Sequence, residues 1–99
     1  MNHSENLLVV ASEECAEIQK ELAKALRFGT DSYHPDEPEK TNGERIVTEF
    51  HQLRAVMDML VKQDILPAMT DSEIFAVYRN KVEAVEKWEQ HSKRNCRVD

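Results

Sequence analysis

The sequence is poor in residues that interrupt regular secondary structure: its 99 residues include two glycines and three prolines. A turn-rich β-sandwich uses such residues at its chain reversals, so this composition argues against that class. Two glycines are also too few for a glycine-rich phosphate-binding loop. The two cysteines, Cys15 and Cys96, form neither a disulfide framework nor a zinc-binding spacing, and they indicate reduced thiols in a cytosolic protein.

Positive charge is in deficit, and long apolar runs are missing. Thirteen Lys and Arg against 19 Asp and Glu give a formal net charge of -6, which disfavours nonspecific binding to DNA, RNA or an anionic membrane. The apolar run at residues 7–11 is too short for a signal sequence or a membrane span. We therefore expect a cytoplasmic protein whose partners include no nucleic acid polymer and no membrane.

The sequence does contain three stretches with apolar residues at steps of three and four, the spacing of amphipathic helices. They run from residue 4 to about 28, from 44 to about 64, and from 71 or 72 towards the C-terminus. The predicted stripes are Leu8, Ala11, Cys15, Ile18, Leu22 and Leu26 in the first stretch, and Ile46, Phe50, Leu53, Met57 and Leu60 in the second. The third stretch carries Ile74, Val77, Tyr78, Lys81, Val82, Val85 and Trp88.

Capping residues define the helix ends. Ser4 is the predicted N-cap of the first helix and Gly29 its stop, while Thr41 or Asn42 caps the second. Residues 30–43 lack periodicity and are predicted to form a long loop over the mouth of a site. Residues 91–99 form a polar tail that is expected to fray.

These stretches predict one all-α domain over residues 1–99. It is a small bundle of about three helices, in which two long helices run antiparallel and a third joins them. A domain of this size buries a small share of its surface, and the helices are rich in charge. We therefore expect oligomerisation to complete the core.

Acidic residues gather in the first helical stretch, where Glu14 and Glu17 share one side, one residue before the predicted buried stripe and about 100° around the helix from it. Glu49 and Gln52 repeat this arrangement in the second stretch. If the two helices pair through their apolar stripes, these four side chains meet at one edge. Magnesium and manganese prefer such oxygen donors. The alternative is a solvated acidic face, relieved by nearby lysines.

The segment Glu13-Glu14-Cys15-Ala16-Glu17 resembles the EExxE motif of the MazG-like family, the all-α nucleoside triphosphate pyrophosphohydrolases. An ExxD motif on the following helix completes the site in that family. The chain is most similar to the family's phage and bacterial branch, and the resemblance covers about residues 7–60. The further segments that carry it are Lys24-Ala25-Leu26-Arg27-Phe28-Gly29, Asp31, Tyr33-His34-Pro35 and Asn42-Gly43-Glu44-Arg45.

The resemblance implies a set of site residues. Glu13, Glu14 and Glu17 would be the catalytic carboxylates, with Glu13 orienting a ligand or a metal-bound water. Glu14, Glu17, Glu49 and Gln52 would hold Mg, or Mn in its place. Gln52 departs from the motif because it stands where the family has Asp, and it offers one neutral oxygen. Three carboxylates would then face the charges of a metal pair.

Basic and aromatic residues would complete the substrate site. The resemblance and the spacing suggest Lys24, Arg27 and Lys81 as phosphate-binding residues; the alternative for each is a solvated or dipole-compensating charge. Phe28 and Tyr33 are candidates for stacking on a base. Trp88 is assigned to the core.

The activity implied by the resemblance is metal-dependent hydrolysis of a (d)NTP to the (d)NMP and pyrophosphate, which would control or clean a nucleotide pool. A homodimer or homotetramer is implied as well. Two other functions stay open at this stage. One is a nucleotide-binding or protein-interaction module of the same fold that Gln52 has weakened catalytically. The other is a plain helical adaptor with solvated acids.

Overall fold

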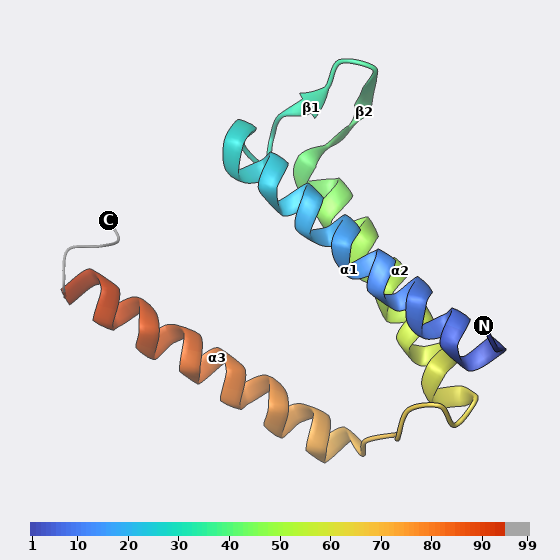
Figure 1. Cartoon of the computed structure of the whole chain (residues 1–99). Coiled ribbons are helices and arrows are strands. Elements are labelled where there is room, and N and C mark those ends of the chain that lie inside the picture. Colours follow the sequence, from blue (N-terminus) through green and yellow to red (C-terminus); the bar gives the residue numbers. More distant parts are fainter. Residues whose placement is uncertain (95–99) are drawn as a thin grey trace. The chain divides into compact units, whose positions relative to one another are not determined.

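The computed structural model describes residues 1–94, and side chains through residue 92. Its elements are α1 (His3–Phe28), β1 (Tyr33–His34), β2 (Glu37–Thr41), α2 (Asn42–Lys62) and α3 (Asp71–Arg94) (Figure 1). The predicted all-α class with three helices is confirmed. By its internal contacts the chain divides after Pro67 into two units, and each is described by itself.

The helix ends follow local capping chemistry. Asn2, and not the predicted Ser4, caps α1, because its side chain accepts a hydrogen bond from the Glu5 N–H. Gly29 ends α1 as predicted, with a φ of 93° that disfavours other residues. Thr41 caps α2 in a capping box with Glu44.

The third helix begins at Asp71, as predicted. The preceding Thr70 and Glu73 exchange hydrogen bonds, since each side chain accepts from the other residue's backbone N–H. The helix continues through Arg94, so it includes the first four residues of the predicted polar tail. Residues 95–99 lie outside the described part of the chain.

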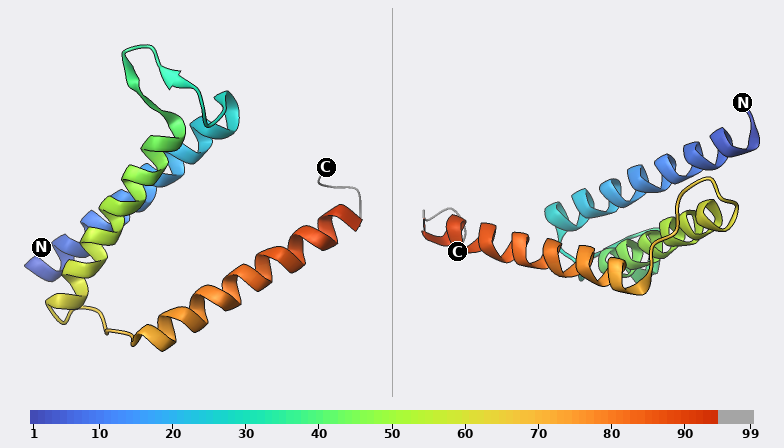
Figure 2. Two further views of the ribbon diagram at one scale, coloured as in Figure 1. Left: turned by 180° about the vertical axis from the view of Figure 1, so that it is seen from behind. Right: turned by 90° about the horizontal axis from the view of Figure 1, so that it is seen from below.

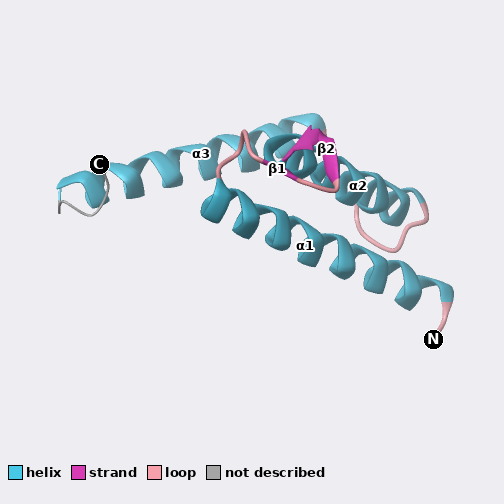
Figure 3. Cartoon of the chain, turned by 90° about the horizontal axis from the view of Figure 1, so that it is seen from above, coloured by secondary structure: helices cyan, strands magenta, loops and turns pink. Residues whose placement is uncertain are grey.

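Residues 30–43, predicted as a loop, contain a short antiparallel hairpin in which Tyr33 pairs with Thr41 and His34 with Glu37 (Figure 3). Its base is tied to the helix pair, because the Gly43 N–H donates to the Thr30 carbonyl. A Cβ at Gly43 would stand 3.3 Å from that oxygen, so the close approach favours glycine. The hairpin is thereby fixed to the end of the α1–α2 pair.

In the first unit, α1 and α2 lie side by side and antiparallel (Figures 1 and 2). The apolar cluster between them lies in the N-terminal half of α1 and the C-terminal half of α2. Leu60 at its centre is fully buried. The cluster consists of Leu7, Ala11 and Leu60, with Leu53, Val56, Ile65 and Leu66 packed against it.

The predicted buried stripe of α1 is correct at Ala11 and Ile18 and wrong in phase at its other four positions. Leu8, Leu22 and Leu26 are exposed, as is Cys15. The residues that face α2 come about one position earlier, roughly 100° around the helix; they are Leu7, Ala11, Glu14, Ile18, Glu21 and Ala25. We call these residues, with Ile46, Glu49, Leu53, Val56 and Leu60 of α2, the seam.

Contacts at the two ends of the seam explain this rotation. At one end Leu60 packs with Leu7 and Ala11. At the other, the buried Asn42 side chain donates to the Gly29 carbonyl at 3.0 Å. Together these contacts fix the face that α1 turns towards α2, and its most apolar face stays uncovered within this unit.

The second unit contains α3, and most of its side chains are exposed. Trp88, assigned to the core from its spacing, is 65% exposed and stacks on His91 with ring centroids 5.4 Å apart. The assignment fails because α3 has no second helix within its unit. Among the described residues, no helix is long and apolar enough to cross a membrane.

Candidate functional site

Acidic side chains occupy the middle of the seam. Glu14 and Glu21 of α1 face Glu49 of α2, and Glu21 is 6% exposed. Burial raises the pKa of Glu49 above its usual value, and the charge of Glu14, with which it shares a hydrogen bond, raises it further. Glu17 and Glu21 add smaller effects in the same direction. The fold therefore brings two of the predicted ligands, Glu14 and Glu49, together across the seam, while Glu17 is exposed and acts on Glu49 only through its charge.

Helical geometry sorts the neighbouring side chains onto two flanks. In an antiparallel pair, residues one position before a seam residue point to the same flank on both helices. Glu13, Glu17 and Gln52 each precede a seam residue, so they share one flank, which we call the acidic flank. Lys24 and Arg45 lie on the same flank, nearer the hairpin.

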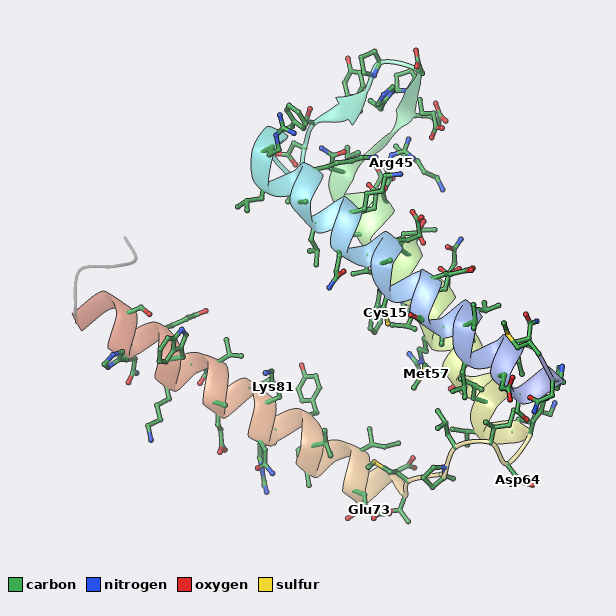
Figure 4. The ribbon with its side chains drawn as sticks, viewed as in Figure 1. Cys15, Arg45, Met57, Asp64, Glu73 and Lys81 are labelled. Carbon is green, nitrogen blue, oxygen red and sulfur yellow. The ribbon has the colours of Figure 1, made fainter. Side chains whose placement is uncertain are left out.

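The opposite flank is apolar. Leu8, Cys15 and Leu22 of α1 and Phe50 and Met57 of α2 each follow a seam residue, and all are exposed. Figure 4 shows the labelled Cys15 and Met57 along one edge of the helix pair. We call these five residues the apolar flank. Five of the eleven apolar residues predicted to lie between the helices are therefore on this outer surface.

Two carboxylate oxygens in the seam lack partners. Glu14 Oε2 and Glu21 Oε2 are buried and accept no hydrogen bond from the described residues. An unsatisfied buried acceptor costs about 1–3 kcal/mol, and more when it is charged. A bound cation would satisfy these oxygens and would also reduce the repulsion that raises the Glu49 pKa.

The donor set suits a hard divalent cation, because magnesium and manganese take carboxylate oxygens. The side chains of the described residues nevertheless do not form a group of three or more His, Cys, Asp or Glu arranged to hold a metal ion. Glu13, Glu17 and Gln52 are exposed, so rotation of their side chains would be needed for convergence. The cluster therefore supplies metal-type donor atoms, but its described side chains are not arranged as a metal site.

The predicted phosphate-binding residues are dispersed. Lys24 Nζ lies 3.5 Å from Glu21 Oε1 and so reaches the acidic cluster. The Arg27 guanidinium lies over the Phe28 ring, 5.0 Å from its centroid. Lys81 is an exposed residue of α3, in the other unit.

Arg45 is a candidate that sequence reasoning did not single out. Its guanidinium forms an ion pair with Glu37 of the hairpin, which raises the pKa of Arg45 and lowers that of Glu37. Its Nε is buried without a hydrogen-bond partner among the described residues. The signal in the sequence was its position four residues before Glu49, which places both side chains on one side of α2.

A cavity of about 240 Å³ lies where the hairpin meets the ends of α1 and α2. The hairpin borders this cavity, and the expectation that residues 30–43 cover the mouth of a site stays a prediction. Side chains of α1, the hairpin and α2 line it, among them Lys24, Phe28, Tyr33, His34, Pro35 and Arg45.

The helix pair thus has an order along its length. The apolar cluster comes first and the carboxylates of the seam follow. The cations Lys24 and Arg45 of the acidic flank come last, beside the cavity with aromatic walls. Such an order can hold a cation and an anion side by side.

No protein-family model matches the chain, and neither does any curated protein or solved structure.

Proposed function

We propose that this chain is a MazG-like, metal-dependent nucleoside triphosphate pyrophosphohydrolase that cleaves a (d)NTP to the (d)NMP and pyrophosphate. The observation that carries the proposal is the meeting of Glu14 and Glu49 across the seam, with a raised Glu49 pKa and unpartnered carboxylate oxygens. The EExxE resemblance of residues 13–17 supports the same activity. Control or clean-up of a cytoplasmic nucleotide pool is the corresponding role.

Each residue has a defined part in the proposed reaction. Glu14, Glu17 and Glu49 would hold Mg or Mn, with Gln52 as a neutral ligand. A bound ion would supply neutralisation of phosphate charge and a lower pKa of the attacking water. Glu13 orients that water through a hydrogen bond.

Cations of the chain complete the phosphate site. Lys24 donates hydrogen bonds to phosphate oxygens beside the cluster, where charge-assisted bonds are strong. Arg27 and Lys81 remain predicted phosphate ligands. Positioning and electrostatic stabilisation supply most of the catalysis in phosphoryl chemistry, so no nucleophilic side chain is required.

A homodimer or homotetramer accompanies this proposal. The apolar flank exposes Leu22 and Phe50 by about half of their surfaces, 49% and 51%, and burial of contiguous apolar surface favours association. Light scattering should give at least twice the 11.5 kDa chain mass. A monomer mass at micromolar concentration would overturn the expectation.

A catalytically weakened nucleotide-binding or interaction module is the second candidate. It is favoured by Gln52, which is exposed and neutral where the motif has an acid, and by the incomplete convergence of the carboxylates. Such a module would be stabilised by nucleotide and metal without releasing pyrophosphate.

The deciding experiment is a pyrophosphate-release assay with a panel of NTPs and dNTPs and Mg²⁺ or Mn²⁺. We expect release from at least one nucleotide, and a loss of at least tenfold in Glu17→Gln. The matched control is Glu86→Gln, an exposed position on α3, which should keep full activity. Release that is no greater than in Glu17→Gln for every nucleotide would refute the hydrolase.

A further inference from the structure

The cavity beside the hairpin has walls suited to a planar ring. Phe28 stands at the end of α1, and Tyr33 and Pro35 belong to the hairpin region. Phe28 and Tyr33 are more than half exposed, at 59% and 55%, so their rings are accessible to a ligand. One face of Phe28 already carries the Arg27 guanidinium. The volume of about 240 Å³ is below that of a typical drug-sized ligand pocket and suits a single ring system with its sugar.

The same cavity has cations on its side towards the acids. Lys24 and Arg45 line it, and Lys24 contacts Glu21 of the acidic cluster. Arg45 Nε is a buried donor without a partner among the described residues. Its guanidinium pairs with Glu37 of the hairpin, so a phosphate would bind the guanidinium in competition with that carboxylate. Aromatic walls and an adjacent cation pair favour a ligand with a flat ring at one end and a phosphate at the other.

The spacing along the helices fits such a ligand. Arg45 precedes Glu49 by one helical turn, about 6 Å along the axis. Glu17 precedes Lys24 by seven residues, about 10 Å. A sugar and one phosphate span a distance of this order, so a ring in the cavity would leave its phosphate chain on the acidic flank.

We propose that the cavity formed by Phe28, Tyr33 and Pro35 is the base-binding site of this chain, in which the base of a nucleotide stacks while Arg45 and Lys24 hold its α-phosphate. This assignment rests on the proposed function for the position of the scissile bond. All residues of the proposed base site lie within residues 24–45 of a single chain. His34 is a further specificity residue: its Nδ1 accepts from the Asp36 N–H, so Nε2 is the nitrogen that carries the hydrogen in the neutral ring and can donate to a base edge.

The test separates binding of the base from binding of the phosphate. Calorimetry compares dAMP, dCMP, dGMP and TMP with deoxyribose 5-phosphate, which has no base, in the presence of Mg²⁺. We expect at least one nucleotide to bind at least tenfold more tightly than the sugar phosphate. Tyr33→Ala should weaken that nucleotide about five- to 150-fold, the usual range for loss of one base-stacking ring, and should leave the sugar phosphate unchanged.

Two control variants keep the test decisive. Tyr33→Phe retains the ring and should bind as the wild type does. Tyr78→Ala removes another exposed tyrosine, from α3 (68%), and should also bind normally. Equal loss in Tyr33→Phe and Tyr33→Ala, or equal effects of Tyr33→Ala and Tyr78→Ala, would overturn the base site.

The outcomes also distinguish this inference from the proposed activity. If binding depends on the base and on Tyr33 but no nucleotide releases pyrophosphate, the proposed base site is supported and the hydrolase activity is refuted. Pyrophosphate release with kcat/KM unaffected by Tyr33→Ala upholds the hydrolase and refutes the cavity.

Discussion

Replacement of Glu49 by glutamine tests the acidic cluster directly. The pKa of Glu49 is raised in the folded chain by burial and by Glu14, so the folded state binds this proton more tightly than the unfolded state does. The stabilisation from this site is therefore present at low pH and is lost as pH rises from about 4.5 through the raised pKa. At neutral pH without metal, the charged Glu49 destabilises the fold.

Burial is the larger cause of the raised Glu49 pKa, and the repulsion between like charges adds a part whose size can be worked out. Two charges about 4 Å apart cost about 1 kcal/mol in water and about 4 kcal/mol near a protein surface. Because Glu49 is only partly buried, we take the lower value. Glu49→Gln should then raise the Tm of the metal-free protein by about 4–8 °C at pH 7 and should flatten the decline of Tm between pH 4.5 and 7.

Added metal should reverse the order of stability, so that the wild type has a higher Tm than Glu49→Gln. With Mg²⁺ or Mn²⁺ the wild type should gain stability by mass action, while Glu49→Gln should gain little. Differential scanning fluorimetry in chelator and in metal, across pH, measures both effects. Asp58→Asn is the matched control, since residue 58 lies about 180° around α2 from residue 49. The reasoning is refuted if Glu49→Gln lowers the metal-free Tm, or if it responds to metal as Asp58→Asn does.

Three further substitutions probe the site and its support. Gln52→Asp should strengthen Mn²⁺ binding measured by calorimetry about tenfold, because a carboxylate replaces a neutral oxygen; unchanged affinity would remove Gln52 from the site. Thr41→Ala should cost about 1 kcal/mol in urea unfolding through loss of the α2 capping box; no change in midpoint would mean that the cap is dispensable. Leu60→Ala should cost about 2–5 kcal/mol in the same assay, since this side chain is fully buried, and a loss below 1 kcal/mol would contradict the placement of the core.

The helices and their ends were largely predictable, because they depend on local interactions. The step of three and four located all three helices, and Gly29 and Thr41 marked ends through their own backbone and side chain. The face that α1 turns inward was not predictable in the same way. Periodicity identifies the apolar side of a helix. In a small chain that side can stay exposed and need not face the neighbouring helix, as Leu22 illustrates at 49% exposure.

The approach of Glu14 and Glu49 was predictable from the sequence, while their proposed role as ligands stays a prediction. Helical spacing alone places each of these acids beside the apolar side of its own helix. Arg45 was missed because its role depends on the hairpin: it pairs with Glu37, and both the hairpin and the cavity arise from contacts between residues 30–43 and the helix ends. The composition of that segment, with its prolines and acids, gives no sign of strand pairing.

The division of the helix pair into an acidic and an apolar flank has a simple geometric origin. In antiparallel helices the residue after each seam position points to one common side, and the residue before it to the other. The chain places Glu17 and Gln52 before seam positions and Leu22 and Phe50 after them. An association that covers the apolar flank would therefore leave the acids, and the cations that follow them along the seam, accessible to a phosphate ligand. Oligomerisation and substrate binding are thus compatible on one pair of helices, since each uses a different flank.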